Sequence, residues 1–406
     1  MRRKKTEVLA IIPARGGSKS IPKKNVKLFN GHPLIAYSIA AGLKAREVSR
    51  VLVSTDDAKI AEVSSYYTAE GPFLRPAQLA RDDTPDLPVF LHALRWLKNK
   101  VNYQPDIVVQ LRPTSPLRPE DCVDRAISTL LRSPEADSVR AVTPAAQNPY
   151  KMWHIKNRFL TPVVKTPLRE AFNVPRQRLP QVYWQTGHID VIRYGTIIGK
   201  HSMTGSHIVP FITDPAYTVD LDTLYDWEFA EWNTYHRNLN IVRPEQPPFF
   251  IKDIRLLVLD FDGVLTDNMV YISRTGKEEV ACNRSDGLGL AILKEIGIKV
   301  IVLSSEKNPV VSQRCKKLGL KSFQGLNNKA DMLKKIILEG HIPAQNIAYV
   351  GNDVNDLACM RMVGFSVAVA NAHSEVLRIA DYVLSKPGGR GAVREICDLI
   401  SFSLKR

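Results

Sequence analysis

Residues 7–25 read EVLAIIPARGGSKSIPKKN, and this stretch decides the fold of the first half of the chain. Val8 to Ile12 is a short apolar run of the kind that a fully buried parallel strand needs. Residues 33–44, PLIAYSIAAGLK, follow with helical periodicity. A strand, a loop and a helix in this order predict the first unit of an α/β sheet.

The alternation of strand and helix patterns continues, stops at a proline-rich break and then starts again. Strands are expected at 50–54 and 106–111, and helices at 57–67, 86–100 and 120–131. The segment 242–252, VRPEQPPFFIK, interrupts this series because its prolines lack a backbone donor and disfavour helix. A second α/β series follows, with apolar runs at 254–259, 299–303, 347–350 and 365–368. We therefore predict two mostly parallel α/β domains, at 1–245 and 253–406.

The composition is that of an ordinary globular protein with a surplus of positive charge. Of the 406 residues, 44% are hydrophobic and 24% charged, and the formal net charge is +15. Only Arg2 to Lys5 forms a tight basic run, and there is no stripe of alternating aromatic and basic residues. Small phosphorylated anions would suit this charge. Nucleic-acid binding, which the net positive charge would also suit, is a weaker hypothesis than those developed below from the motifs.

The cysteines and the apolar segments indicate a cytoplasmic protein without a membrane anchor. The five cysteines are scattered and form no CxxC pair, which argues against a disulfide framework and a zinc site. The run Val8 to Ile12 is too short for a signal sequence or a membrane span. His188, His207 and His373 lack the spacing of metal ligands, and we expect structural roles for them.

The loop after the first strand carries glycines and cations in a pattern suited to a polyphosphate. Glycines let backbone N–H groups approach phosphate oxygens, and Arg and Lys neutralise their charge. The alternative is a basic surface turn. The glycine spacing is that of neither a Walker A loop nor a dinucleotide-binding turn.

Taken as a whole, residues 11–39, IIPARGGSKSIPKKNVKLFNGHPLIAYSI, resemble the opening motif of the acylneuraminate cytidylyltransferases. The resemblance extends to FLRPAQLARDDT at 73–84, QLRPTSPLRP at 110–119, RQRLPQVYWQTGHID at 176–190 and VDLDTLYDWEFAE at 219–231. It implies a Rossmann-like nucleotidyltransferase sheet. It also implies that CTP activates an acidic nine-carbon sugar of the sialic type, with release of pyrophosphate.

The resemblance assigns nucleotide and metal roles to particular residues. It implies that Arg15, Lys19 and Lys24 hold the phosphates and that Asn25 and Arg75 bind the nucleotide. The backbone of Gly16, Gly17 and Ser18 would line the same loop. Asp220 and Asp222, at alternate positions of an extended segment, point two carboxylates to one side, which suits Mg²⁺. Without the motif, such a pair would be read as a solvated strand end.

The resemblance is less specific about which residues contact the sugar. The family often has Gln directly before Pro-Thr-Ser-Pro, whereas Arg112 holds that place here and Gln110 lies two residues earlier. Either side chain is a candidate for contact with the base or the sugar. Arg176 and Arg178 are candidates for the sugar carboxylate, with solvated loop arginines as the alternative. Further candidates for sugar contacts are Tyr183 and Gln185.

The second series contains LDFDGVLTD at 259–267, with two carboxylates at the end of its first strand. At this spacing one carboxylate can act as nucleophile and the other as acid and base beside a metal. The motif resembles the haloacid dehalogenase superfamily, and residues 253–404 resemble the small 3-deoxy-sugar-acid 8-phosphate phosphatases, which assemble as tetramers.

This second resemblance implies a phosphatase site. Asp260 would be the nucleophile and Asp262 the acid, while Ser304 and Lys329 would grip the phosphoryl group. A late segment containing Arg390 would reach a neighbouring subunit of a homo-tetramer. The metal ligands implied in this domain are Asp260, Asp262, Asn352 and Asp353.

Two departures from the phosphatase pattern leave two hypotheses open. Asn352 stands where those phosphatases have an acidic residue, and Ser305-Glu306 replaces their Gly-Arg. The first hypothesis is that the domain removes a phosphate from the sugar acid before activation. The second is that it is a non-catalytic oligomerisation module.

Overall fold

The computed structural model describes residues 6–237, 239–245, 251 and 253–404. The chain divides into two compact units, residues 1–27 with 33–244, and residues 28–32 with 245–406. The basic run at 2–5 and most of the predicted break, at 246–250 and 252, lie outside the described residues.

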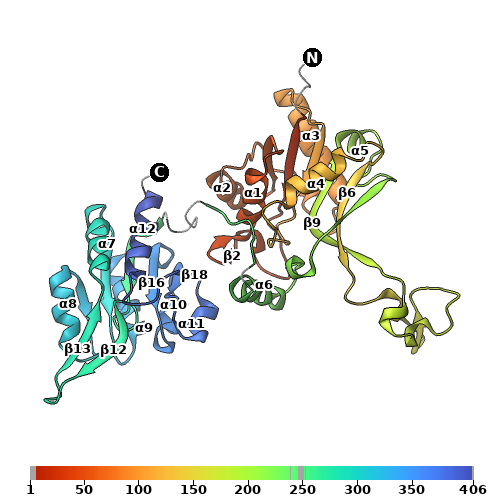
Figure 1. The fold of residues 1–406 in the computed structure, drawn as a ribbon. Coiled ribbons are helices and arrows are strands. Elements are labelled where there is room, and N and C mark those ends of the chain that lie inside the picture. Colours follow the sequence, from red (N-terminus) through yellow and green to blue (C-terminus); the bar gives the residue numbers. More distant parts are fainter. Residues whose placement is uncertain (1–5, 238, 246–250, 252, 405–406) are drawn as a thin grey trace. The chain divides into compact units, whose positions relative to one another are not determined.

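The first unit is built on a mixed, mostly parallel sheet of six strands in the order β10-β6-β9-β5-β1-β4 (Figure 1). Only β9 is antiparallel to its neighbours, β5 and β6. The strands are β1 (Val8–Pro13), β4 (Arg50–Ser54), β5 (Ile107–Gln110), β6 (Ser138–Pro144), β9 (Tyr183–Arg193) and β10 (Ile208–Ile212). The carboxyl ends of β1 and β5 lead into the glycine-rich loop and the Pro-Thr-Ser-Pro loop, which places both loops at one edge of the sheet.

Helices flank this sheet and bury its central strands. They are α1 (Leu34–Lys44), α2 (Ala58–Tyr66), α3 (Asp86–Val101), α4 (Cys122–Leu131), α5 (Tyr194–Ile198) and α6 (Leu224–His236). Leu9 and Ile11 of β1 pack with Leu52 of β4, Phe90 of α3 and Val108 of β5, all fully buried. The strands and helices expected from the sequence are present, and the α/β fold class is confirmed.

An arm that the sequence reading did not predict extends from β6 and β9 (Figure 1). It includes the hairpin of β7 (Trp153–Lys156) and β8 (Phe159–Pro162). Nearly every residue of this hairpin is exposed, so its sequence lacks the alternation that a half-buried strand shows.

A second small sheet, near the start of the chain, joins β2 (Leu28–Phe29) and β3 (His32–Pro33).

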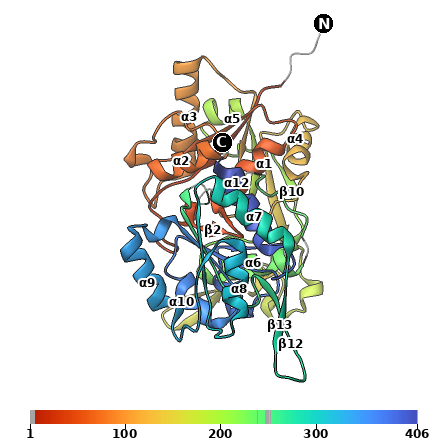
Figure 2. The same ribbon diagram turned by 90° about the vertical axis from the view of Figure 1, so that its left-hand side faces the viewer.

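The second unit has a fully parallel sheet in the order β15-β14-β11-β16-β17-β18. Its strands are β11 (Leu256–Leu259), β14 (Lys299–Leu303), β15 (Lys321–Phe323), β16 (Ile347–Gly351), β17 (Phe365–Ala368) and β18 (Tyr382–Val383). Its helices are α7 (Arg284–Glu295), α8 (Val310–Leu318), α9 (Lys329–Gly340), α10 (Leu357–Met360), α11 (Ser374–Ile379) and α12 (Ala392–Leu404). A hairpin of β12 (Thr266–Ile272) and β13 (Glu278–Cys282) projects beyond this sheet (Figures 1 and 2).

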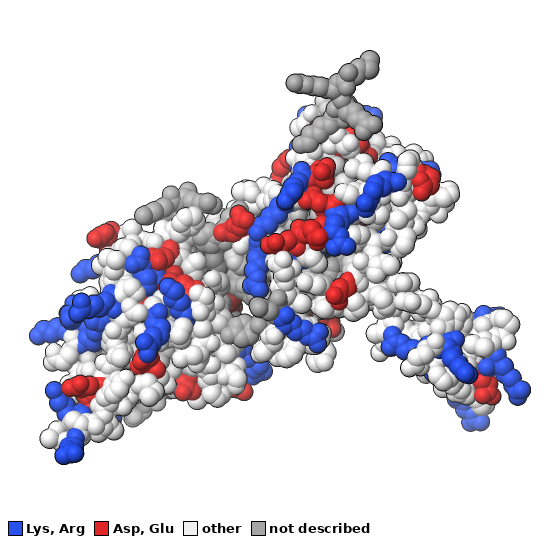
Figure 3. All heavy atoms as spheres, in the orientation of Figure 1, with Lys and Arg blue, Asp and Glu red and all other residues white. Residues whose placement is uncertain are grey.

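The surface charge is spread over both units. On the face drawn in Figure 3, Lys and Arg side chains are scattered and interrupted by Asp and Glu. No single basic patch of the kind that tracks a nucleic-acid backbone dominates that face. Within the described residues, no helix is long and apolar enough to cross a membrane.

Candidate active sites

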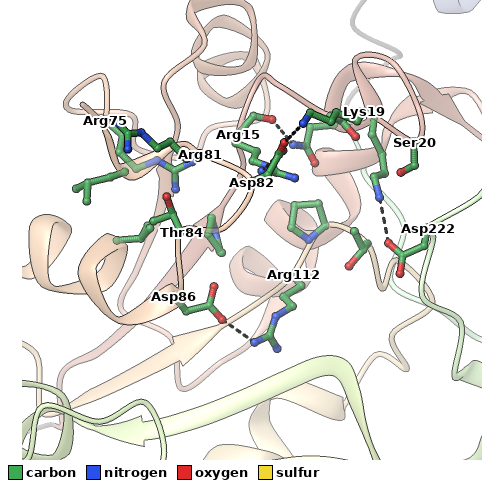
Figure 4. A pocket seen from close by; sticks show the side chains of 18 residues that line it. Arg15, Lys19, Ser20, Arg75, Arg81, Asp82, Thr84, Asp86, Arg112 and Asp222 are labelled. Carbon is green, nitrogen blue, oxygen red and sulfur yellow. Dashed lines mark hydrogen bonds and ion pairs between the residues drawn. The ribbon is translucent and has the colours of Figure 1, made fainter. Parts of the chain in front are cut away.

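A cavity of about 680 Å³ opens in the first unit beside the glycine-rich loop (Figure 4). Cations on several loops surround it, with three carboxylates among them. Its lining comprises Pro13, Arg15, Ser18, Lys19, Ser20, Lys24, Asn25, Arg75, Leu79, Arg81, Asp82, Thr84, Asp86, Val89, Arg112, Pro113, Thr114 and Asp222. The structure thus brings together most of the predicted nucleotide-binding side chains.

The glycine-rich loop is fixed by hydrogen bonds to its own backbone and to a neighbouring loop. The Asn25 Nδ2 donates to the Arg15 carbonyl at 2.9 Å, and the Gly16 N–H donates to Asp56 Oδ1 at 3.1 Å. A Cβ atom at Gly16 would lie 2.8 Å from the Cβ of Asp57, so this position requires glycine. The loop is therefore held close against the chain that follows β4.

Lys24 is a buried cation tied to the segment that carries the Asp220 and Asp222 pair. Its Nζ donates to the Leu221 carbonyl at 2.6 Å and lies 3.4 Å from Asp222 Oδ1. Asp222 is exposed at the cavity rim (Figure 4). This contact joins residues almost two hundred positions apart and places an ammonium group beside the proposed metal site.

Asp82 bridges two of the cations predicted to hold phosphate. It pairs with Arg15 Nη1 at 2.6 Å and with Lys19 through its other oxygen (Figure 4). The hydrogen bond from Lys19 holds the pKa of Asp82 below its usual value. Asp82 thus forms ion pairs with the two cations that would otherwise bind a phosphate group.

Arg75 is nearly fully buried in the wall of the cavity. It lies 3.7 Å from Asp56 Oδ1, and within the described residues its Nε has no hydrogen-bond partner. Desolvation lowers the pKa of the Arg75 guanidinium. A buried N–H group without a hydrogen-bond acceptor lowers stability, unless a bound ligand supplies the acceptor.

Gln110 and Arg112 share one carboxylate, Asp86. Gln110 Nε2 donates to Asp86 Oδ2 at 2.8 Å, and Arg112 Nη2 donates to the same oxygen at 2.7 Å. Arg112 lines the cavity, whereas Gln110 is buried behind it. Desolvation lowers the pKa of Arg112, but Asp86 and Asp190 outweigh it and leave that pKa raised.

Asp220 and Asp222 lie near enough to repel each other. Although Asp220 is an exposed residue, desolvation of its carboxyl group and the charge of Asp222 raise its pKa, against a lowering hydrogen bond from Thr114. Like charges held together in this way favour a bound cation.

The remaining predicted sugar residues do not line this cavity. Arg176 donates to the Ala145 carbonyl at 3.0 Å and lines a cavity of about 300 Å³ on the arm. Arg178 and Tyr183 are exposed, and Gln185 accepts a hydrogen bond from Arg140 Nη1 at 3.1 Å. Their assignment to the sugar stays a prediction.

Arg118, at the end of the Pro-Thr-Ser-Pro loop, is a fully buried cation. It donates to the carbonyls of His188 and Arg112, at 2.6 and 2.7 Å, and to Ser38 Oγ at 3.0 Å. In the described part of the chain, no carboxylate forms an ion pair with it. Burial lowers the pKa of Arg118 to about 10, so it remains a cation at neutral pH. This side chain pins the loop that carries Arg112 to strand β9 and helix α1.

Replacing Arg118 by Met should destabilise the first unit. The change removes the Arg118 donor to the buried His188 carbonyl, at roughly 1–3 kcal/mol. The Arg112 carbonyl loses one donor and keeps another, because Ser38 Oγ also donates to it at 3.2 Å. We expect a net loss of about 1–3 kcal/mol, and differential scanning calorimetry should show one transition lowered by roughly 3–10 °C. An unchanged thermogram would contradict this account of Arg118.

In the second unit, Lys329 joins two buried carboxylates. Its Nζ lies 2.6 Å from Asp260 Oδ1 and 2.8 Å from Asp356 Oδ1. The hydroxyl of Tyr349 and the backbone N–H of Asn352 also donate to Asp356, at 2.7 and 2.9 Å. Burial and the nearby Asp356 raise the pKa of Asp260, and Lys329 opposes them. The predicted nucleophile therefore lies at the carboxyl end of β11 with a cation in contact.

Asp262 lies in an acidic environment. Desolvation raises its pKa first, followed by the charges of Glu306 and Glu278, while Lys329 opposes them. Glu306 is held in place because its Oε1 accepts from the backbone N–H groups of Lys307 and Asn308, at 2.6 and 2.8 Å. A raised pKa suits a carboxyl group that must deliver a proton.

The side chain of Asn352, the residue after β16, packs against Gly263 in the loop that follows β11. Gly263 has φ +76°, and a Cβ there would collide with the Asn352 side chain. The Asn352 Oδ1 is buried without a hydrogen-bond partner. Among the described residues, no group of three His, Cys, Asp or Glu side chains is placed to hold a metal ion. Asp353, by contrast, caps a short helix through the N–H of Val354 at 2.7 Å.

Ser304 and Arg390 lie on loops at the same end of the second sheet. Ser304 is buried at the end of β14, and its Oγ accepts from the Glu306 N–H at 3.0 Å. Arg390 Nη2 pairs with Asp267 Oδ2 at 3.1 Å. Gly388 and Gly389 approach the backbone of residues 263–267 so closely that a side chain would not fit. Within one chain, this late segment thus lies against its own Asp260 loop.

Sequence reasoning missed several charged residues that complete these sites. They are Arg81, Asp82, Asp86, Arg118, Asp190 and Asp356. Arg81, Asp82, Arg118 and Asp190 lie inside motifs quoted above, so charged positions within a recognised motif were the available signal for them. Asp86 lies two residues after such a motif, and Asp356 lies three residues after the predicted ligand Asp353.

Comparisons with known proteins match both units. The family model described as Cytidylyltransferase matches residues 9–164, and the haloacid dehalogenase-like hydrolase model matches residues 320–396. The N-acylneuraminate cytidylyltransferase A of Danio rerio is 27% identical over 413 residues, covering 100% of this chain and 91% of that protein.

Two further relatives match the C-terminal part. The 3-deoxy-D-manno-octulosonate 8-phosphate phosphatase KdsC of Escherichia coli K12 is 44% identical over 154 residues, which are 37% of this chain and 80% of that protein. A crystal structure of a haloacid dehalogenase family hydrolase from Streptomyces avermitilis is 46% identical and covers 37% of this chain and 86% of that chain, with a TM-score of 0.36.

Proposed function

We propose that this chain activates a nonulosonic acid with CTP. Its N-terminal part is a cytidylyltransferase-family domain, and its C-terminal part belongs to the haloacid dehalogenase-like phosphatases. The cation-lined cavity beside the glycine-rich loop carries this proposal. We place the two domains at residues 1–245 and 253–406. The products are a CMP-sugar and pyrophosphate.

The triphosphate would bind by exchange with Asp82. Arg15 and Lys19, now paired with that carboxylate, would turn to the phosphate oxygens, and Lys24 would meet them from the other side. Arg75 lines the cavity together with Leu79 and Val89, and its buried Nε has no partner among the described residues, so it would bind the nucleoside. The sugar's anomeric hydroxyl then loses its proton to solvent as its oxygen bonds to the α-phosphorus, and the bond from that phosphorus to the pyrophosphate oxygen breaks, so that pyrophosphate leaves. Lys24 and Arg15 stabilise the charge that develops.

Mg²⁺ fits the pair Asp220 and Asp222, because desolvation and then the charge of Asp222 raise the pKa of Asp220, and a bound cation would favour its charged form. Two carboxylates together with substrate phosphates are an ordinary Mg²⁺ environment. When bound, the ion would supply charge neutralisation at the α-phosphate. Lys24 would keep Asp222 oriented through its contacts with that segment.

A substrate panel tests this function. CTP, UTP, ATP and GTP are each combined with sialic, deaminated sialic, legionaminic and pseudaminic acids, and pyrophosphate is measured. We expect release with CTP and at least one of these acids, and at least about tenfold less with each other nucleotide, a discrimination of about 1.4 kcal/mol. Pyrophosphate release that does not depend on the acid, or that is equal for all four nucleotides, would contradict the proposal.

We further propose that the second domain is a phosphatase for a nonulosonic acid phosphate. Asp260 would attack the phosphorus, Asp262 would give its proton to the departing sugar oxygen, and water would then release inorganic phosphate from Asp260. The contact between Lys329 and Asp260 supports this role. Asp260, Asp262, Asn352 and Asp353 would hold Mg²⁺ here, since the buried Oδ1 of Asn352, which no described residue satisfies, is a neutral oxygen of the kind that Mg²⁺ accepts as a ligand.

The alternative of a non-catalytic assembly module has its own support. Glu306 adds negative charge near Asp262, and Asn352 supplies a neutral ligand where a charged one is usual. The β12–β13 hairpin also exposes Met269, Val270, Tyr271 and Ile272, a surface that a second copy would cover in the proposed homo-tetramer. Assembly through this hairpin is compatible with either role.

A further inference from the structure

We propose that Asp190, a buried carboxylate outside the cavity, is a positioning residue that fixes Arg112 for binding of the acidic sugar. This inference rests on the proposed function of the first domain. Asp190 lies on β9 with 1% of its surface exposed. It accepts from Arg112 Nη1 at 3.1 Å and from Arg140 Nε at 2.9 Å.

Asp190 acts together with Asp86 on the same guanidinium. Arg112 Nη2 donates to Asp86, which lines the cavity, at 2.7 Å (Figure 4). Its Nη1 donates to the buried Asp190 Oδ2 at 3.1 Å. Two anchors in different directions fix both the position and the plane of the guanidinium group. An arginine has five N–H donors, so three remain for other contacts.

The charges of this cluster cancel. Arg112 and Arg140 bring two positive charges, and Asp86 and Asp190 bring two negative ones. Arg112 therefore offers oriented hydrogen bonds rather than a net positive charge. Such donors suit the hydroxyl groups of a sugar, whereas the triphosphate would face Arg15 and Lys19, two cations that share the single negative charge of Asp82.

The position of Arg112 along the loop favours the sugar over the nucleotide. Two residues later, the Thr114 carbonyl accepts from the Leu221 N–H at 2.9 Å, between Asp220 and Asp222. The loop is thus joined to the segment where the two substrates would meet. Gly187 lets β9 approach this loop, because a Cβ there would collide with the hydroxyl of Ser115.

The test compares Asp190→Asn with Asp137→Asn, in wild type and in the Arg112→Gln background, using CTP and N-acetylneuraminate. Asp137 is a buried carboxylate directly before neighbouring β6; it pairs with Lys200, accepts from the backbone N–H groups of Ser206 and His207, and forms no ion pair with Arg112 among the described residues. It controls for lost stability. Steady-state KM values are measured for both substrates, with melting temperatures recorded for every variant.

We expect Asp190→Asn to raise the sugar KM about tenfold and to change the CTP KM less than about threefold, since one charged anchor is lost. In Arg112→Gln enzyme the same change should add less than about twofold, because the two residues act as one unit. Asp137→Asn should leave both KM values within about twofold while lowering the melting temperature.

Equal penalties in the two backgrounds would overturn the inference, since Asp190 would then act without Arg112. A rise in the CTP KM as large as that for the sugar would overturn it too. If Asp190→Asn does not fold, Asp86→Asn in both backgrounds gives the same comparison for the other anchor. A wild type that turns over none of the acids in the panel contradicts the proposed function and, with it, this inference.

Discussion

Lys24→Gln enzyme should synthesise the CMP-sugar about 10²–10³ times more slowly than wild type, with most of the loss in kcat. The ammonium group of Lys24 is buried at the cavity wall and held by the Leu221 carbonyl at 2.6 Å. Because it is fixed before the substrates arrive, its charge acts on the pentavalent phosphorus without reorganisation. Removal of one such fixed donor costs about 3–4 kcal/mol of transition-state stabilisation.

Lys23→Gln is the matched control for this variant. Lys23 is the preceding residue, is exposed and does not line the cavity, and its replacement changes the net charge equally. We expect its rate to stay within about twofold of wild type. If both variants lose activity alike, general electrostatic attraction explains the effect, and the assigned role of Lys24 is wrong. The melting transition of each variant, compared with wild type, reports whether the first unit is folded.

Asp260→Asn should abolish phosphate release from N-acetylneuraminate 9-phosphate, by at least about 10³-fold. An amide cannot form the acyl phosphate, and loss of a nucleophile removes the whole covalent route. The change is isosteric, and Lys329 keeps its 2.8 Å contact with Asp356. Malachite-green measurement of phosphate gives the rate, and the cytidylyltransferase rate should be unchanged.

Asp331→Asn provides the control for the second domain. Asp331 is an exposed carboxylate in the first turn of α9, two residues after Lys329. Its variant should release phosphate at the wild-type rate. Should wild type release no phosphate above Asp260→Asn, the phosphatase proposal fails and the oligomerisation module is favoured.

What the sequence predicted correctly was local. The strand Val8–Pro13 before the glycine-rich loop, and the strand Leu256–Leu259 before Asp260 and Asp262, are continuous stretches whose structure the sequence predicted. The chemistry assigned to these residues stays a prediction. Helix and strand periodicities likewise predicted the α/β fold class. Each of these features depends on neighbours a few residues away.

What the sequence could not predict depends on contacts between distant segments. Asp82 meets Arg15 and Lys19 across more than sixty positions, and Arg112 meets Asp190 across 78. No local pattern distinguishes such a carboxylate from a solvated one. The arm with β7 and β8 was missed for the opposite reason, because its exposed strands bury too little to leave a pattern.

The most direct test of the central claim is identification of the product. Wild-type protein is incubated with CTP, Mg²⁺ and each nonulosonic acid of the panel, and the mixture is followed by ³¹P NMR and mass spectrometry. We predict a new phosphodiester resonance and pyrophosphate in equal amounts, with the mass of a CMP-sugar, for at least one acid. Conversion of CTP to CMP and pyrophosphate without a sugar ester, for every acid, would contradict the account.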